Sequence, residues 1–216
     1  MHRSCVAAAS AALLFCGAAH ADTIQIQSDN AASSNSTSFG GFTGTATYND
    51  LGGGMAEFIL SLTNTSQFNG KLVALAFDSA AGTSGWTFDS GASSGLSGDW
   101  GNLSGSINTQ PFGSRSHGAS TTNQWEGGGN PNTGLAVGET GTWVFTGSGG
   151  ASVSATDFLS PNGGQNLVIR FRGFDNEASD KLPAIEVPGN PVPGIGGLAA
   201  LGGLAVVRRQ IGRAHV

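Results

Sequence analysis

Cysteine is nearly absent from this chain. The 216 residues contain two, Cys5 and Cys16, and both lie in an apolar N-terminal stretch. The rest of the chain can therefore form no disulfide and no cysteine-ligated metal site, so its hydrophobic core must hold it together. The 165 residues from Asp22 to Glu186 are enough for one domain with such a core.

Basic residues are also scarce in this central part. Between Asp22 and Pro193 there are 14 acidic residues against five basic ones, a net charge of −9. Phosphate groups are bound by basic surfaces, so this balance argues against nucleic acid as a partner. With 36 glycines and few charged side chains, the surface is expected to consist mainly of Ser, Thr, Asn and Gly.

Histidine is too rare for the common catalytic sets. His117 is the only one between Asp22 and Pro193. Gly91–Gly95 matches the G-x-S-x-G nucleophile pattern, and Asp99 and His117 follow it in the order of a Ser-Asp-His triad. That motif needs a strand that turns into a helix, and no helix is expected here. We therefore predict no catalytic residues and a non-enzymatic protein.

Helical periodicity is missing, whereas apolar residues alternate with polar ones in many short segments. The residues expected to face the core of the resulting strands are Phe58, Leu60, Leu62, Val73, Leu75, Phe77, Trp143, Phe145, Leu167, Ile169 and Phe171. Arg170 and Arg172 are expected to point the other way, and 155–160 could form one helical turn. Seven or more strands without helices predict an all-β fold, an antiparallel β-sandwich of jelly-roll-like form, with a closed barrel as the alternative.

Residues 90–137 do not fit this pattern, because they are rich in Gly, Ser and Asn. A loop of this length within a compact domain is uncommon. Its large aromatic residues either plug one end of the sheet or form a binding surface. On the second interpretation, Trp86, Trp100 and Trp125 are candidates for stacking on sugar rings in a carbohydrate-binding module.

Carboxylates are the remaining groups that could take part in catalysis or bind a metal ion. A pair of them could serve a secreted hydrolase, and the candidates are Glu57, Glu126, Glu139, Asp78, Asp89 and Asp99. Asp175, Asn176, Glu177 and Asp180 concentrate oxygen atoms at the end of a strand. Such oxygens suit Ca²⁺, and a solvated acidic turn is the alternative. No other cofactor is expected.

The N-terminus has the three parts of a secretory signal peptide. Weakly basic residues precede an apolar stretch from Val6 to Ala19, and Ala19-His20-Ala21 fits the small-x-small cleavage pattern. Cleavage after Ala21 would leave Asp22 as the first residue of the mature protein.

The C-terminus contains a hinge, a short apolar segment and a basic tip. Residues 187–194 form the hinge, whose Pro188, Pro191, Val192, Pro193 and Gly194 disfavour regular structure. Residues 195–207 are uncharged and would span about 20 Å as a helix, against a hydrocarbon core of about 30 Å. The basic tip consists of Arg208, Arg209 and Arg213. Positive charge is retained in the cytoplasm, so the tip predicts an exported body on a transient transmembrane helix.

This order of parts resembles the PEP-CTERM sorting signal of exosortase systems, with Pro191-Val192-Pro193 in place of Pro-Glu-Pro. The stretches 157–160, 167–174 and 179–181 are in turn similar to the last strands of uncharacterised β domains that precede such tails. The resemblance implies a Gram-negative bacterium, an intermediate anchored in the inner membrane, and a final location at the cell surface or outside the cell. It also implies the export machinery, a membrane-embedded sorting protease or transpeptidase, and exopolysaccharide as partners.

Four regions are thus predicted: a signal peptide at 1–21, a β ectodomain at 22–186, a hinge at 187–194 and a sorting signal at 195–216. The expected function is that of a non-enzymatic protein of the cell surface or extracellular matrix. A carbohydrate-binding module is the first alternative, and a carboxylate-dependent hydrolase is the second.

Overall fold

The computed structural model describes residues 20–35, 37, 40–122, 124–125, 131, 133–159, 165–175 and 178–188. These residues form ten strands and two short 3-10 helices. The elements are β1 (His20–Ser28), η1 (Asn30–Ala32), β2 (Phe42–Gly52), β3 (Met55–Asn64), β4 (Lys71–Phe77), β5 (Ser84–Ser94), β6 (Gly101–Asn108), β7 (Ser114–Ser120), β8 (Thr140–Ser148), η2 (Ala155–Phe158), β9 (Val168–Arg172) and β10 (Ser179–Glu186).

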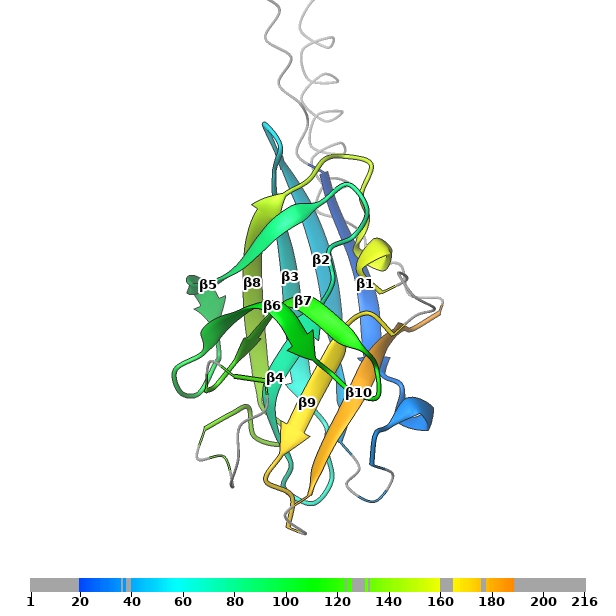
Figure 1. Ribbon diagram of the computed structural model, residues 1–216, viewed down its shortest axis with the longest axis vertical. Helices are drawn as coiled ribbons and strands as arrows, with labels where there is room; N and C mark the ends of the chain where they lie inside the picture. The colour runs from blue at the N-terminus through cyan, green and yellow to red at the C-terminus, as the bar shows by residue number, and fades with distance from the viewer. Residues whose placement is uncertain are drawn as a thin grey trace, which may run out of the picture.

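The strands form one sheet in the order β5-β8-β3-β2-β1-β10-β9-β4-β7-β6, and every neighbouring pair is antiparallel. The pairing of β1 with β10 joins the first and last strands of the body at the centre of the sheet. The sheet curls until its edge strands β5 and β6 approach each other (Figure 1). The predicted all-β, antiparallel architecture is thereby confirmed, and its form is nearly closed and barrel-like.

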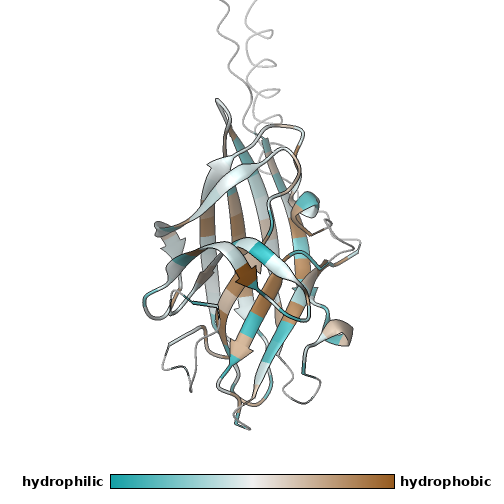
Figure 2. Cartoon of the chain, viewed as in Figure 1, coloured by the Kyte–Doolittle hydropathy of each residue, from teal (hydrophilic) through white to brown (hydrophobic). Residues whose placement is uncertain are grey.

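The main core lies inside the curled sheet, between its two halves. Figure 2 shows hydrophobic residues concentrated along the strands in the middle of the body. The ring of Phe58 on β3 stacks on Phe158 of η2 with centroids 4.0 Å apart, and it contacts Phe77 of β4 edge-on at 5.1 Å. Every residue that the alternation pattern placed in the core is buried. Burial of one face of each strand supplies the main stabilisation of this disulfide-free body.

A second cluster covers the outer face of β4 and β9. It consists of Ala74, Ala76, Leu103, Ile107, Phe112, Trp125 and Val168. Strand β6 supplies Leu103 and Ile107 to this layer, and β7 pairs with β6, so the described part of residues 90–137 contains two strands. As predicted, Arg170 points away from the main core. This layer buries it, and its guanidinium donates to the backbone oxygen of Trp125.

The single helical turn expected at 155–160 is present as η2. The backbone N–H of Ser154, just before it, donates to the Asp157 carboxylate at 2.8 Å. A carboxylate in this position satisfies an N–H at the start of the turn.

Candidate functional site

A seam runs where the edge strands β5 and β6 approach each other. The backbone N–H of Phe88 on β5 donates to Oδ1 of Asn102 on β6 at 2.9 Å. Nearby, Nδ1 of His117 on β7 lies 3.0 Å from the backbone oxygen of Trp86 on β5. These side chains satisfy backbone groups that an edge strand would otherwise expose, and they hold the sheet in its nearly closed form.

His117 is hydrogen-bonded through both ring nitrogens. Its Nε2 atom lies 3.1 Å from Oγ of Ser79, in the turn that follows β4. Because the Trp86 carbonyl can only accept, the network assigns the hydrogen to Nδ1, and Nε2 of the neutral ring accepts from the Ser79 hydroxyl. Burial lowers the pKa of His117, while the Trp86 carbonyl and the Asp78 carboxylate act in the opposite direction. The neutral imidazole is therefore favoured at neutral pH.

Asp78 and Arg115 form an ion pair beside this imidazole. Nη1 of Arg115 lies 3.8 Å from Oδ2 of Asp78, and the Arg115 side chain is only 4% exposed. The other carboxylate oxygen accepts from the Ser116 hydroxyl at 2.8 Å, and Nε of Arg115 donates to the backbone oxygen of Asn166 at 2.7 Å. The carboxylate is thus bound to groups other than the imidazole.

This arrangement sets the chemistry of what we call the seam cluster, made of Asp78, Ser79, Arg115, Ser116 and His117. A serine hydroxyl that donates to a neutral imidazole is a proton-transfer pair. In the serine hydrolase triad, however, a carboxylate orients the imidazole, whereas here a backbone carbonyl does so. The hydrogen bonds of His117 connect β5, β7 and the turn that follows β4. We therefore assign the seam cluster a structural role in closing the sheet.

The G-x-S-x-G match lies on β5 and in the turn after it. Oγ of Ser93 donates to the backbone oxygen of Asp89 at 2.7 Å and accepts from the N–H of Val144 at 3.0 Å. The next element is β6, so no helix follows the motif. Because His117 binds the hydroxyl of Ser79, the hydrogen bonds pair it with a serine outside the motif.

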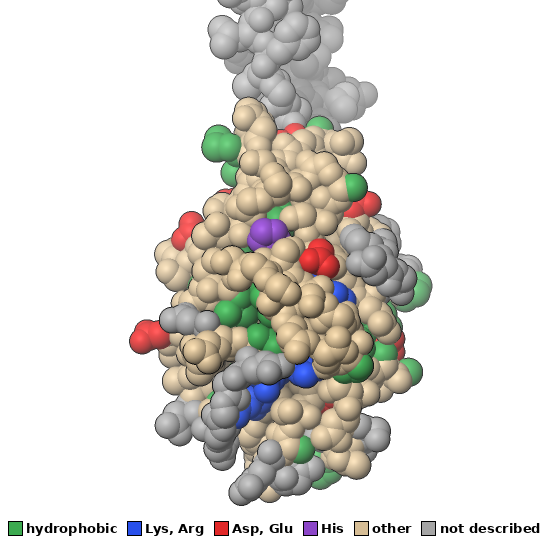
Figure 3. Space-filling view, in the orientation of Figure 1, with side chains coloured by type: hydrophobic (Ala, Val, Ile, Leu, Met, Phe, Trp, Pro, Cys, Tyr) green, Lys and Arg blue, Asp and Glu red, His purple; other side chains and the backbone are tan. Residues whose placement is uncertain are grey.

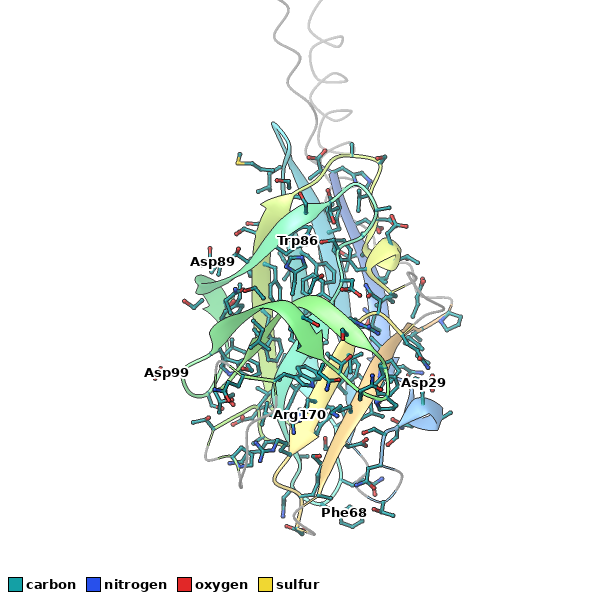
Figure 4. The ribbon with its side chains drawn as sticks, in the orientation of Figure 1. Asp29, Phe68, Trp86, Asp89, Asp99 and Arg170 are labelled. Atoms are coloured by element: carbon teal, nitrogen blue, oxygen red, sulfur yellow. The ribbon has the colours of Figure 1, made fainter. Side chains whose placement is uncertain are left out.

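The three candidate tryptophans are buried, with exposed fractions of 2% for Trp86, 8% for Trp100 and 6% for Trp125. Trp86 lies in the interior (Figure 4), where its Nε1 donates to Oγ1 of Thr83 at 3.1 Å. Trp100 packs edge-on against Trp143, with ring centroids 5.0 Å apart. A sugar stacks on an exposed aromatic face, so each of these rings would have to be uncovered first.

Trp100 borders a groove of about 380 Å³ at the end of β5. It is lined by Phe88, Ser90, Ser93, Ser94, Gly95, Leu96, Gly98, Asp99 and Trp100. Serine hydroxyls and one exposed carboxylate provide hydrogen-bonding groups, while the aromatic residues contribute apolar edges. Figure 4 shows Asp99 at this side of the body.

Only part of the predicted calcium site can be placed. Asn176 and Glu177 lie outside the described residues, and Oδ1 of Asp175 accepts from Nδ2 of Asn69 at 3.0 Å. Asp180 is fully buried on β10. Among the described residues, no group of three or more His, Cys, Asp or Glu side chains is arranged to hold a metal ion.

The carboxylate of Asp180 instead binds the loop that follows η1. It accepts from the hydroxyls of Ser33 (2.8 and 2.9 Å) and Ser34 (3.2 Å), and from the backbone N–H groups of Asn35 and Gly40 (each 3.1 Å). A buried carboxylate is stable only when such donors replace its water. Asp180 therefore anchors Ser33, Ser34, Asn35 and Gly40 to the sheet.

Most carboxylates considered for a hydrolytic pair have local partners, and Glu126 lies outside the described residues. The partners of Asp78 are given above. Glu57 accepts from the Asn49 side-chain amide, Glu139 from the N–H of Ala136, and Asp89 from the N–H of Gly91.

The predicted processing sites lie at the two ends of the described chain. Ala19 is outside the described residues, whereas Ala21 and Asp22 lie on β1 and pair with Asn49 and Tyr48. Pro188 is the last described residue, so the rest of the hinge and the basic tip, Pro191 to Arg213, lie outside. None of the helices in the described part is long and apolar enough to cross a membrane.

Sequence reasoning missed the pairing of Ser79 with His117 and the anchoring role of Asp180. Ser79 and His117 are 38 residues apart in the chain, so no local pattern links them. The rarity of histidine was the one signal that pointed to the seam cluster. Comparison of the chain with models of protein families, with curated proteins and with solved structures finds no significant match in any of the three.

Proposed function

We propose that this is an exported, non-enzymatic protein of the cell surface or extracellular matrix, sorted by its C-terminal signal. The observation that carries the proposal is the position at which the last strand of the described residues ends. β10 ends at Glu186, and the N–H of Val187 makes one further bond, to the backbone oxygen of Gln25 at 2.9 Å. Among the described residues, neither hydrophobic cluster includes one beyond this point.

The surface supports the same proposal. The face in Figure 3 consists mostly of backbone and of uncharged polar side chains, with few charged ones. Such a surface suits a protein that works outside the cell, where solubility comes from hydroxyl and amide groups. As part of this proposal, the curled sheet is a flattened sandwich of jelly-roll-like form.

Truncation tests the proposal. A chain that ends after Glu186 should fold and be exported, but be shed into the medium because it lacks the sorting signal. The full chain should be retained or processed at the envelope. Retention of the truncated chain at the surface would contradict the proposed role of the tail.

Alanine substitution of Arg208, Arg209 and Arg213 is the matched control. It keeps the hinge and the apolar segment but removes the charge that should hold the C-terminus in the cytoplasm. The variant should be mislocalised like the truncated chain while its body stays folded. Normal sorting of the variant would show that the basic tip is not part of the signal.

A carbohydrate-binding module is the second candidate, and the groove beside Trp100 favours it over the hydrolase. Hydroxyls, a carboxylate and aromatic edges are the groups that recognise polyhydroxylated ligands. A glycan array probed with the wild-type body and with Asp99→Ala tests it. Asp99 is exposed, so the variant should fold normally and lose binding. Equal glycan binding by the wild-type body and the variant would exclude the groove as the binding site.

A further inference from the structure

The hairpin between β2 and β3 ends in an exposed apolar tip. Leu51 is 47% exposed and Met55 is 61% exposed, and they are two of the four large hydrophobic residues that are exposed in the described part of the chain. Hydrophobic side chains are visible beside this tip in Figure 3. Two apolar side chains on one tight turn form a small patch, whereas single exposed ones need no explanation.

The backbone holds this tip in a defined conformation. Gly52, Gly53 and Gly54 have φ values of 77°, 63° and 80°, which favour glycine. The N–H of Gly52 donates to Oδ1 of Asp50 at 2.9 Å, and the N–H of Gly149, in the loop after β8, donates to the oxygen of Gly54 at 3.2 Å. The tip is therefore presented by a braced turn.

The tip lies at the end of the body toward which the last described residues, Val187 and Pro188, point. His20, at the start of β1, pairs with Asp50 beside the tip. The chain after β10 runs antiparallel to β1, since Glu186 pairs with Ile26 and the N–H of Val187 then donates to Gln25. It thus leaves the sheet in the direction of the tip, which stands at the upper end of the body in Figure 1.

The length of the hinge matches this geometry. From Gln25 to His20, β1 covers about 17 Å at ~3.4 Å per residue. The six residues between Pro188 and Ile195 can span roughly 20 Å when extended. The apolar segment can therefore enter a membrane at about the level of the tip.

We propose that Leu51 and Met55 contact the lipid interface while the apolar segment of the tail spans the membrane. The proposal rests on the membrane-inserted tail of the proposed function. Neutral lipid is the partner that fits, because the body is acidic and Glu57 lies beside the tip on the same hairpin. Leu51 and Met55 insert between headgroups, and the body is thereby oriented with its hinge near the bilayer.

The contact depends on the tether. Two apolar side chains do not hold a soluble domain on a membrane, since even a single myristoyl chain gives only marginal binding. A short tether raises the effective concentration of the tip at the membrane to the millimolar range, which makes a weak contact persist. Cleavage of the hinge ends the contact, so the processed body is released.

An environment-sensitive fluorophore on a single cysteine tests this. Met55→Cys is made in a chain whose Cys5 and Cys16 are serine, expressed in a host without the sorting enzyme. Phe68→Cys is the matched control, because Phe68 is 49% exposed and lies at the opposite end of the body (Figure 4). Both proteins are reconstituted through their tails into phosphatidylcholine vesicles that carry a spin-labelled quencher lipid.

The label at position 55 should shift to the blue and be quenched by the lipid, and the label at position 68 should show neither effect. Both effects at position 55 should disappear in a chain that ends after Pro188 and when Leu51 is changed to Glu. If the protein floats with the vesicles but the label at 55 stays in a water-like environment, the contact is refuted while the tail insertion stands. If the protein does not float with the vesicles at all, the proposed tail insertion fails, and the contact fails with it.

Discussion

Single polar side chains fix the parts of this body that backbone pairing does not reach. His117 links β5 and β7 to the turn after β4, and Asp180 anchors Ser33 and Gly40 to the sheet. Asp180 is fully buried and His117 is partly buried, and both rely on protein partners in place of water. Substitutions at such residues should therefore lower the free energy of unfolding more than substitutions at exposed residues.

His117 should make stability depend on pH. Burial lowers its pKa in the folded state, so the unfolded chain binds a proton first as the pH falls. The contribution of His117 to the free energy of unfolding is complete above its pKa of about 6.5 in the unfolded chain. It is lost as the pH falls from there toward the lower pKa of the folded state. Urea unfolding between about pH 5.5 and 7.5 should show a falling free energy of unfolding toward acid. His117→Gln should flatten this slope, and an unchanged slope would exclude His117 as its source.

Asp180→Asn should destabilise the body by roughly 1–3 kcal/mol, because the amide turns a donor toward groups that themselves donate. Denaturant unfolding measures the cost. Hydrogen exchange should also accelerate at the N–H groups of Asn35 and Gly40, which the carboxylate binds. Asp175→Asn is the control, since Asp175 is exposed and should change stability by at most about 0.5 kcal/mol. Equal effects of the two variants would contradict the anchoring role.

The strands could be predicted where large apolar residues recur at every second position, even where the outer face is buried as well, as in β4. Residues 58–62 and 73–77 alternate with period two, and both lie in strands whose inward residues are fully or nearly fully buried. β7 lacks this signal, because its sequence Ser-Arg-Ser-His-Gly-Ala-Ser contains one apolar side chain. It was missed for that reason. The pairing of β1 with β10 joins the two ends of the body, and no local pattern reports such a contact.

The β9 strand offers the direct test of the predicted core. Ile169 is fully buried, so Ile169→Ala should cost roughly 2–5 kcal/mol of unfolding free energy. Ile59 on β3 is partly exposed and lies between the buried Phe58 and Leu60, and Ile59→Ala should cost clearly less. Chemical denaturation of both variants checks the difference. A neutral effect of Ile169→Ala would show that the inward face of β9 is wrongly assigned.

At the scale of the whole molecule, the candidate site was the least predictable part. The G-x-S-x-G pattern around Ser93 reflects the high content of Gly and Ser in the chain. The interaction of His117 with Ser79 depends instead on how β4 and β7 pair. The tryptophans were predicted either as plugs or as a binding surface, and the tertiary structure buries Trp86 and Trp100 in the main core and Trp125 in the second cluster. The domain ends at Asp22 and at the hinge stay predictions, based on the sharp change of composition at both points.

The mature N-terminus should be Asp22. Cleavage there removes His20 and Ala21 from β1 and leaves the pairs from Asp22–Tyr48 onward intact. Oδ2 of Asp22 also accepts from the N–H of Ala155 at 2.8 Å, so the first mature residue is tied to η2. N-terminal sequencing of the exported protein checks this, and a retained Met1 would contradict it.

The intact mass of the protein recovered from the cell surface tests the central claim most directly, because it reports the C-terminal end of the processed body. We predict a chain that begins at Asp22 and ends within residues 187–194, with the complete β body and without the apolar segment. A surface protein whose mass still includes Arg213 would contradict the removal of the tail.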